Sequence, residues 1–165
     1  MTQCAVRPAC EADLPAILAI HNDAVLTQTS IWNDKPVDVG DRRIWWQARV
    51  AQNFPVLVAD WDGAIAGYGS FGDFRPHEGY RYTVEHSLYV ARSARRRGIG
   101  TTLLLRLIED ARALGKHVMV GGIAADNAAS LALHARLGFV ETARMPEVGL
   151  KFGRWLDLVF VQKTL

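Results

Sequence analysis

The residues whose types and spacing most clearly suggest chemistry form the run Arg95-Arg96-Arg97-Gly98-Ile99-Gly100. An apolar segment, 83–90, precedes this run, and leucines at helical spacing follow it from Leu103 onward. A basic glycine turn between a strand and a helix directs backbone N–H groups at one point near the positive end of the helix dipole, which favours a bound phosphate. Gly98 and Gly100 also let a ligand approach the backbone closely, because glycine has no Cβ.

The pattern of glycines narrows the choice of phosphate ligand. A dinucleotide fingerprint, G-x-G-x-x-G, would need glycine at 103, where the chain has Leu103. The P-loop pattern G-x-x-x-x-G-K-[ST] does not occur. What remains is Arg95-x-x-Gly98-x-Gly100, which by itself is equally compatible with a solvated basic turn before a helix. The rest of the chain has to decide between the two interpretations.

Length and composition indicate one soluble globular domain over residues 1–165. Half of the residues are hydrophobic and 22% are charged, and the net charge of +2 is too small to indicate a nucleic-acid-binding protein. Cys4 and Cys10 show no metal-binding spacing, so we expect reduced thiols, no metal site and a cytoplasmic protein. The chain shows no signal peptide and no apolar run of membrane-spanning length, so we expect no membrane association.

Hydrophobic periodicity and the positions of glycine and proline predict the elements that must hold the glycine turn in place. The predicted strands are 4–7, 55–60, 64–74, 80–90, 117–123, 139–148 and 154–163. The predicted helices are 11–27, 41–51, 98–114 and 128–137, and the main loops are 28–38, 75–79 and 149–153. The order of elements is therefore β-α-α-β-β-β-α-β-α-β-β.

This order, together with two motifs, resembles the GNAT acetyltransferases over nearly the whole chain. The Arg95–Gly100 turn is similar to the loop with which those enzymes hold the pyrophosphate of acetyl-CoA, and the segment from Asn127 to Phe139 resembles their N-x-x-[SA]-x-x-[LF]-[YH]-x-x-x-G-F pattern. The resemblance implies an α/β (α+β) GNAT fold, with a mixed, mostly antiparallel, twisted sheet of about seven strands flanked by about four helices. It also implies acetyl-CoA as co-substrate.

Three further segments resemble one branch of that family, the phosphinothricin acetyltransferases. They are 83–90 (TVEHSLYV), 74–76 (FRP) and 148–157 (VGLKFGRWLD). Within the branch, the chain looks most similar to bacterial enzymes that acetylate methionine sulfoximine and methionine sulfone. The resemblance therefore implies acetyl transfer to the α-amine of a small amino-acid analogue, with phosphinothricin as a further candidate, by a homodimeric enzyme.

Acetyl transfer to an amine needs a base for the amine proton, a polarised thioester carbonyl and a proton for the departing thiolate. Glu85 interrupts an apolar strand and shares one face with Ser87 and Tyr89, which makes it the candidate base. The pattern alone also allows a solvent-facing glutamate, and the resemblance favours the catalytic role. His134 stands where most GNAT enzymes have the tyrosine that protonates the thiolate, and its alternative role is packing beside the cofactor.

The resemblance also implies the binding residues. Those expected at acetyl-CoA are Leu88, Tyr89, Val90, Arg95, Arg96, Arg97, Gly98, Ile99, Gly100, Thr101, Asn127 and Ser130. Those expected at the amino-acid substrate are Trp32, Arg75, Pro76, His77, Glu85, His86, Ser87 and Lys151. Arg75 would bind the substrate carboxylate through its guanidinium. For Asn127 the alternative is a helix N-cap, for Trp32 core or dimer packing, and for His86 a hydrogen-bonded place in the core.

Two other functions stay open from the sequence. One is the same transfer to a protein N-terminus or a polyamine, although Arg75 opposes a polycationic substrate. The other is a non-catalytic acyl-CoA-binding module, against which Glu85 argues because binding alone needs no carboxylate in that strand.

Overall fold

The computed structural model describes residues 4–165, and the elements follow the predicted order. The seven strands are β1 (Cys4–Pro8), β2 (Val56–Trp61), β3 (Ala64–Asp73), β4 (Thr83–Val90), β5 (Val118–Ala124), β6 (Val140–Lys151) and β7 (Arg154–Thr164). The four α-helices are α1 (Leu14–Thr27), α2 (Val39–Ala51), α3 (Ile99–Ala113) and α4 (Ala128–Arg136). Short 3₁₀ turns lie at η1 (Glu11–Asp13), η2 (Glu78–Tyr80) and η3 (Arg92–Ala94).

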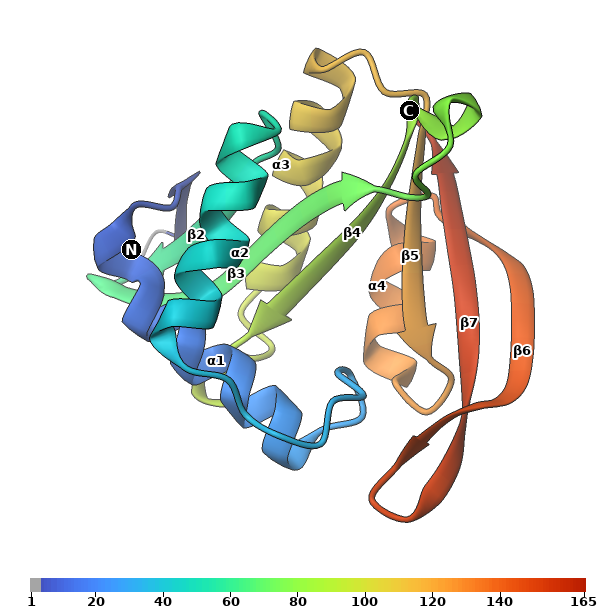
Figure 1. Ribbon diagram of the computed structural model, residues 1–165, viewed down its shortest axis with the longest axis horizontal. Helices are drawn as coiled ribbons and strands as arrows, with labels where there is room; N and C mark the ends of the chain where they lie inside the picture. Colours follow the sequence, from blue (N-terminus) through green and yellow to red (C-terminus); the bar gives the residue numbers. More distant parts are fainter. Residues whose placement is uncertain (1–3) are drawn as a thin grey trace.

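The strands form one mixed, twisted sheet in the order β1-β2-β3-β4-β5-β7-β6, as Figure 1 shows. Only the β4–β5 pair is parallel among the described strands, and the other five neighbouring pairs are antiparallel. The predicted mixed and mostly antiparallel sheet with four helices is therefore confirmed.

Helices cover both faces of the sheet, and strand alternation supplies a core to each face. In β2, Leu57 and Ala59 pack in the larger core with the apolar side of α3, while Val56 and Val58 pack in a second core with α1. The same alternation holds in β4, where Val84 belongs to the α3 core. Residues of β4 on the opposite face therefore lie on the side of α1 and α2.

The parallel strands β4 and β5 are hydrogen-bonded at one end only. The gap between their unpaired ends positions the candidate functional site. The paired residues run from Thr83 with Val118 to His86 with Gly121. Beyond His86 the two strands diverge, as the green β4 and the orange-brown β5 do in Figure 1. Each strand keeps a partner on its outer side, β3 for β4 and β7 for β5, so both stay extended while the gap between them widens.

Two predicted boundaries differ from the structure. The predicted strand 80–90 begins only at Thr83, because the chain from Glu78 to Tyr80 folds into a 3₁₀ turn. The predicted loop 149–153 is mostly strand: β6 continues to Lys151, and the turn is confined to Phe152 and Gly153, both with positive φ. The last residues of β6 bury Gly149 and Lys151 and expose Leu150, the reverse of the apolar-in, polar-out alternation that identifies strands in a sequence.

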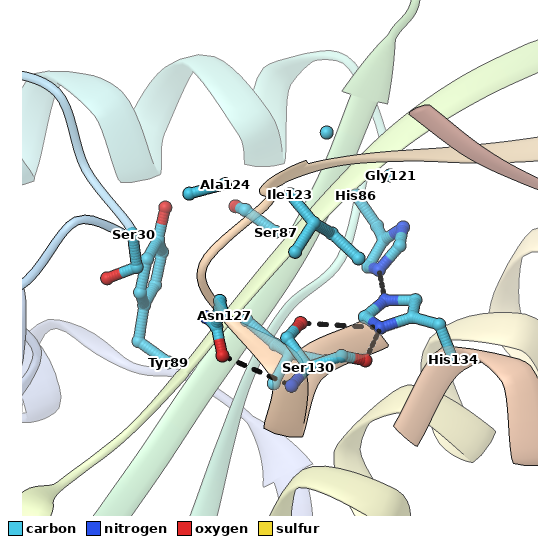
Figure 2. Close-up of a pocket in the computed structure, with 12 residues that line it drawn as sticks. Ser30, His86, Ser87, Tyr89, Gly121, Ile123, Ala124, Asn127, Ser130 and His134 are labelled. Carbon is cyan, nitrogen blue, oxygen red and sulfur yellow. Dashed lines mark hydrogen bonds between the residues drawn. The ribbon is translucent and has the colours of Figure 1, made fainter. Parts of the chain in front are cut away.

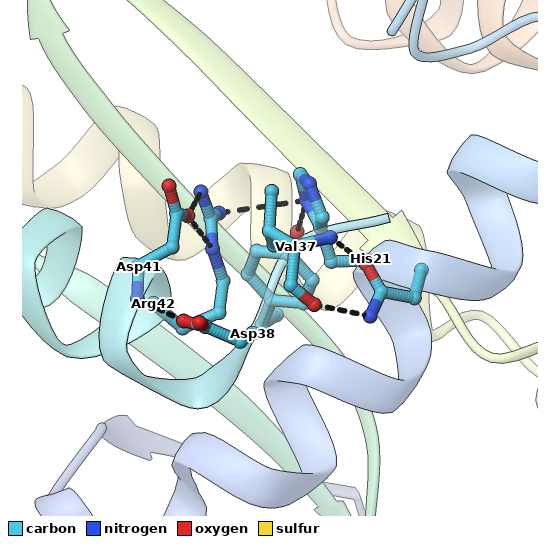
Figure 3. Close-up of polar contacts among 7 residues, drawn as sticks. His21, Val37, Asp38, Asp41 and Arg42 are labelled. Carbon is cyan, nitrogen blue, oxygen red and sulfur yellow. Dashed lines mark hydrogen bonds and ion pairs between the residues drawn. The ribbon is translucent and has the colours of Figure 1, made fainter. Parts of the chain in front are cut away.

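The loop 28–38 between α1 and α2 is held at its far end by polar contacts from both helices (Figure 3). The Asn22 side chain in α1 pairs with both backbone groups of Val37, donating to its carbonyl at 2.8 Å and accepting from its N–H at 3.0 Å. Asp38 then caps α2 by accepting a hydrogen bond from the Asp41 N–H at 2.8 Å. These contacts determine where the loop enters α2.

The near part of the same loop is held by Lys151, at the end of β6. Its ammonium group is buried and donates to three backbone carbonyls, at Val25 (2.6 Å), at Ile31 (2.8 Å) and at Asn33. Three hydrogens meet three acceptors, so the buried charge is fully hydrogen-bonded. Lys151 therefore ties the loop 28–38 to the β6–β7 hairpin.

Replacing this ammonium should destabilise the fold. Lys151→Met leaves three backbone carbonyls without their donor, and we expect a loss of roughly 2–4 kcal/mol in the free energy of unfolding. Urea denaturation followed by circular dichroism measures it. Lys35→Met is the matched control, because Lys35 is exposed, and it should change stability by less than about 0.5 kcal/mol. Equal stability of the two variants would contradict the anchoring role of Lys151.

Candidate active site

A pocket occupies the gap where β4 and β5 diverge, and α4 borders it on one side (Figure 2). Tyr89 and Ser30 lie on one side of it, and His86 and His134 lie on the other. The lining residues are Ser30, His86, Ser87, Leu88, Tyr89, Gly121, Gly122, Ile123, Ala124, Asn127, Ser130 and His134. Seven of the residues predicted for the site from the sequence thus line one pocket.

Glu85 lies at the last stretch of paired β4–β5 backbone, opposite Val120 in β5 and Gly72 in β3. Its side chain keeps 36% of its surface exposed, so the carboxylate is half-buried and accessible to a substrate. A Cβ placed on Gly122 would lie 3.4 Å from the carboxylate oxygen Oε1, which puts the carboxylate beside the opening of the gap. The structure is thus compatible with the predicted role of Glu85 as a base.

One arginine faces this carboxylate. Arg75 Nη1 lies 4.0 Å from Glu85 Oε2, and the guanidinium is placed over the ring of Phe74 at 4.2 Å. Burial raises the pKa of Glu85 above its usual value, and the positive charge of Arg75 opposes that shift. A carboxyl with a raised pKa is a better proton acceptor near neutral pH than an ordinary surface glutamate.

On the opposite face of β4, His86 contacts His134 of α4. Their Nε2 atoms are 2.8 Å apart, and both side chains are buried. His86 Nδ1 lies 2.8 Å from the Val120 carbonyl oxygen, and His134 Nδ1 lies 2.7 Å from that of Ser130. Burial lowers the pKa of both imidazoles. Both ring nitrogens of His134 therefore have protein partners. The hydroxyl of Ser130, which lines the same pocket, lies 3.4 Å from His134 Nδ1.

The start of α4 is built by Asn127, which caps the helix by accepting a hydrogen bond from the Ser130 N–H at 3.1 Å. This is the alternative role that the sequence left open for Asn127. It does not exclude a ligand contact, because Asn127 lines the pocket and capping uses only its side-chain oxygen.

The basic glycine turn leads from η3 into α3. Arg96 and Gly98 have φ of 62° and 79°, so the backbone is in the left-handed region at both positions and makes the tight turn into the helix. The first-turn N–H groups, from Ile99 to Thr101, are those that an α-helix leaves without intrahelical acceptors. A Cβ on Gly100 would lie 3.3 Å from the Leu133 side chain, so glycine also permits close packing against α4.

The three arginines of this turn are not equivalent. Arg95 donates to the Gln28 side chain at 2.7 Å, and Arg97 lies 5.5 Å from the centre of the Trp61 ring. Arg96, Arg97 and Gly98 are exposed. The turn therefore presents exposed positive charge together with the first-turn N–H groups of α3, an arrangement that suits a phosphate group.

Several predicted substrate residues lie elsewhere. Trp32 packs against Gly149 of β6, and its indole N–H donates to the Thr29 carbonyl at 2.7 Å, which matches the packing alternative. Lys151 uses its ammonium group to hold the loop and presents no free cation. Pro76 and His77 are exposed before η2 and do not belong to the pocket lining.

Sequence reasoning missed some pocket residues. Ser30 reaches the pocket from the loop 28–38, and no local pattern marks it. Gly121 and Gly122 line the pocket from β5, and two adjacent glycines within a strand were a usable sequence signal of close packing there. At Gly121 a Cβ would come within 2.7 Å of the His86 ring. Glycine at 121 therefore makes room for the buried histidine.

Comparison with known proteins assigns the family. Residues 17–139 match the model of the acetyltransferase (GNAT) family, and the chain belongs to this family. It is 56% identical over 161 residues to the L-methionine sulfoximine/L-methionine sulfone acetyltransferase of Pseudomonas paraeruginosa (strain DSM 24068 / PA7), covering 97% of this chain and 94% of that protein. It is 39% identical to the phosphinothricin N-acetyltransferase of Alcaligenes faecalis, covering 98% of this chain and 83% of that protein.

A solved structure agrees with both findings. The acetyltransferase yncA from Salmonella typhimurium, determined with its cofactor acetyl-CoA, superposes with a TM-score of 0.96 at 53% identity, covering 98% of this chain and 94% of that chain. The fold predicted from the resemblance and the family are therefore confirmed.

Two other features of the described residues, 4–165, concern membranes and metals. No helix in this range has the length and apolar character needed to cross a bilayer. The same range contains no group of three or more His, Cys, Asp or Glu side chains placed to hold a metal ion.

The glycine pair in β5 generates a prediction. Gly121→Ala places a methyl group against His86, and we expect it to lower the free energy of unfolding by about 1–3 kcal/mol, the range for overpacking. The matched variant Gly122→Ala meets its nearest neighbour at an ordinary 3.4 Å and should stay within about 0.5 kcal/mol. Thermal denaturation measures both. If the two variants were equally stable, His86 would not need the space at 121.

Proposed function

We propose that this protein transfers the acetyl group of acetyl-CoA to the α-amine of a small amino-acid analogue such as methionine sulfoximine or methionine sulfone. The observation that carries the proposal is the half-buried Glu85 carboxylate beside a pocket between two diverging strands, with Arg75 next to it. The names of the similar enzymes from Pseudomonas paraeruginosa and Alcaligenes faecalis support this class of substrate, with phosphinothricin as a candidate acceptor.

The residues around the gap fit acetyl-CoA. On the side that faces β5, the edge of β4 at Leu88–Val90 has no strand paired with it among the described residues, so backbone groups on that side can pair with the extended pantetheine arm. The turn from Arg95 to Thr101 would bind the pyrophosphate, and Asn127 and Ser130 would contact the pantetheine at the start of α4. When bound, acetyl-CoA supplies the activated acetyl group.

The reaction then needs three proton transfers. Glu85 accepts a proton from the substrate ammonium, directly or through water, and the free amine attacks the thioester carbonyl. The nitrogen gives its second proton to solvent water as the amide forms. An N–H of the β4 edge polarises that carbonyl. His134 supplies the proton that the departing thiolate takes up. Arg75 binds the α-carboxylate of the amino acid and thereby holds its amine near Glu85.

We also propose a cytoplasmic homodimer. Six large apolar side chains of the β6–β7 hairpin are more than 40% exposed, which supports a second copy packing there; they are Val140, Met145, Val148, Leu150, Phe152 and Trp155. Both cysteines are free thiols, as suits a reducing compartment, and acetyl-CoA is an intracellular metabolite. Analytical ultracentrifugation of the protein and of Trp155→Asp tests the dimer: the variant should sediment as a monomer.

Removing the charge of Glu85 should impair the chemical step. Glu85→Gln keeps the shape of the side chain but cannot take a proton, and we expect kcat/KM to fall by about 10²-fold or more. Thiol release from acetyl-CoA with methionine sulfone measures it. Glu78→Gln, at an exposed glutamate of η2, should stay close to the unchanged protein. Full activity of Glu85→Gln at neutral pH would remove Glu85 from the role of base.

Arg75 should affect both substrate binding and the pH profile. Arg75→Ala should raise KM for the amino acid by about 10-fold or more, because a charge-assisted contact is lost. It also removes the positive charge that opposes the raised pKa of Glu85. Since the base must be ionised, kcat/KM is lost as pH falls through that pKa, and the loss should begin at a higher pH in the variant. The control variant Arg81→Ala should change neither KM nor the acid limb of the pH profile. If Arg75→Ala also left both unchanged, Arg75 would neither bind the substrate carboxylate nor influence the pKa of Glu85.

A panel of acceptors tests the reaction itself. Methionine sulfone, methionine sulfoximine, phosphinothricin, methionine, a polyamine and an N-terminal peptide are each supplied with acetyl-CoA, and free thiol is followed. We expect turnover on the sulfone or sulfoximine to exceed that on the peptide and the polyamine. Turnover on the peptide or the polyamine alone would overturn the substrate class, and acetyl-CoA binding without any turnover would favour a binding module.

A further inference from the structure

We propose that His86 and His134 share one proton between their Nε2 atoms, and that Ser130 relays a proton from this pair to the thiolate that acetyl transfer releases. The proposal rests on the proposed function for the identity of the proton acceptor. The protonation state of the pair stands on the geometry of this chain alone.

The Nδ1 atoms of both rings each lie within 2.8 Å of a backbone carbonyl oxygen, that of Val120 for His86 and that of Ser130 for His134. A carbonyl oxygen only accepts hydrogen bonds, so each Nδ1 must carry a hydrogen to make a favourable contact. In a neutral imidazole with Nδ1 protonated, Nε2 has a lone pair and no hydrogen. Two neutral rings held in this way would therefore point two lone pairs at each other.

The observed Nε2–Nε2 distance is 2.8 Å, the length of a good hydrogen bond. One added proton turns the repulsive contact into a charge-assisted hydrogen bond and leaves both carbonyl contacts intact. The pair then carries three hydrogens on four nitrogens and a single positive charge. Burial opposes that charge, and the two carbonyl oxygens together with the inter-ring hydrogen bond favour it.

The surroundings of the pair contain little else that titrates. Strand β5 contributes Gly121 and the Val120 carbonyl, α4 contributes Ser130, and the Phe139 ring packs against both imidazoles at 5.6 and 5.1 Å. Two charged side chains lie nearby in the sequence but do not join the cluster: Glu85 is on the other face of β4 beside Arg75, and Arg136 is exposed at the end of α4. The protonation state of the two histidines is therefore determined mainly by their own hydrogen bonds.

A proton can leave the pair through Ser130. Its hydroxyl lies 3.4 Å from His134 Nδ1, and Ser130 lines the pocket (Figure 2). In the relay, His134 Nδ1 gives its hydrogen to the Ser130 oxygen while the Ser130 hydroxyl gives its own hydrogen to the thiolate sulfur, forming the S–H bond. The shared proton then settles on His134 Nε2 and is donated to His86 Nε2. One proton has left, the pair has become neutral, and solvent restores the proton after the product departs.

The protonation state can be measured without any substrate. Protein labelled with ¹⁵N at histidine is titrated from pH 6 to pH 9 by long-range proton–nitrogen NMR, and His86→Gln and His134→Gln assign the resonances among the five histidines. At pH 7 we expect both Nδ1 atoms to be protonated and one low-field proton to be coupled to both Nε2 atoms. An unprotonated Nδ1 in either ring at pH 7 would overturn the shared proton. This result does not depend on which amine the enzyme acetylates.

The relay is tested by kinetics on the full-length protein. Ser130→Ala should lower kcat by about 10-fold or more, while Ser130→Thr, which retains a hydroxyl, should stay within about 3-fold. Acetyl-CoA affinity, measured by calorimetry, separates the relay from a binding role. A raised Kd with unchanged kcat in Ser130→Ala would overturn the relay, and so would equal losses of kcat in the Ala and Thr variants.

His86 gives a second kinetic test, since it acts through His134 and is a positioning residue. A proton donor loses activity as pH rises through its pKa, and without His86 the buried His134 holds its proton less tightly. The alkaline limb of kcat in His86→Gln should therefore move to lower pH by about one unit or more. An alkaline limb at the same pH as in the unchanged protein would contradict the shared proton.

Discussion

The rest of the site depends on the end of hydrogen bonding between β4 and β5 after His86 and Gly121. Both strands remain anchored on their outer sides, so the sheet opens between them without unfolding. The opening leaves backbone groups of β4 free at its edge and gives α4 a place beside the gap. A sheet that stayed paired along its full length would offer neither a hydrogen-bonding edge nor a pocket for an extended cofactor arm.

The two faces of β4 divide the proposed chemistry. Glu85 stands on the face of α1 and α2, half-buried and beside Arg75, where an amino acid can reach it from solvent. His86 stands on the other face, fully packed against His134, Val120 and Phe139. Alternation along one strand thus places the solvent-accessible Glu85, which we propose as the base, and the buried histidine pair on opposite faces of β4. The burial of His86 depends on glycine at position 121, because a side chain there would occupy the space of the imidazole ring.

Much of the fold could be predicted from the sequence, because helix and strand periodicity is strong where elements are buried on one side. The strand before Arg95 and the helix after Gly100 are examples, and so is the cap at Asn127. Strand β6 was predicted to end too early because its last residues bury Gly149 and Lys151 and expose Leu150, the reverse of the usual apolar-in, polar-out alternation. The predicted strand 80–90 started at Tyr80, whereas the chain at Glu78–Tyr80 turns as a 3₁₀ helix.

Site residues that belong to a local sequence motif could be predicted. Contacts between residues far apart in the sequence could not. Residues that share a motif with the family, such as Glu85 and His134, could be named from the sequence. The contact between His86 and His134 joins positions 48 apart, and nothing local in the sequence indicates it. Lys151 was likewise predicted at the substrate, whereas its three carbonyl partners lie in α1 and the loop that follows it, more than 100 residues earlier.

The measurement that tests the account most directly is hydrogen–deuterium exchange of the backbone amides with and without acetyl-CoA. The account predicts slower exchange on binding at Leu88–Val90 and from Gly98 to Thr101, with little change in β1 and β2. Protection at these two segments would establish the gap between β4 and β5 as the cofactor site. Unchanged exchange there at saturating acetyl-CoA, or protection confined to other elements, would contradict the account.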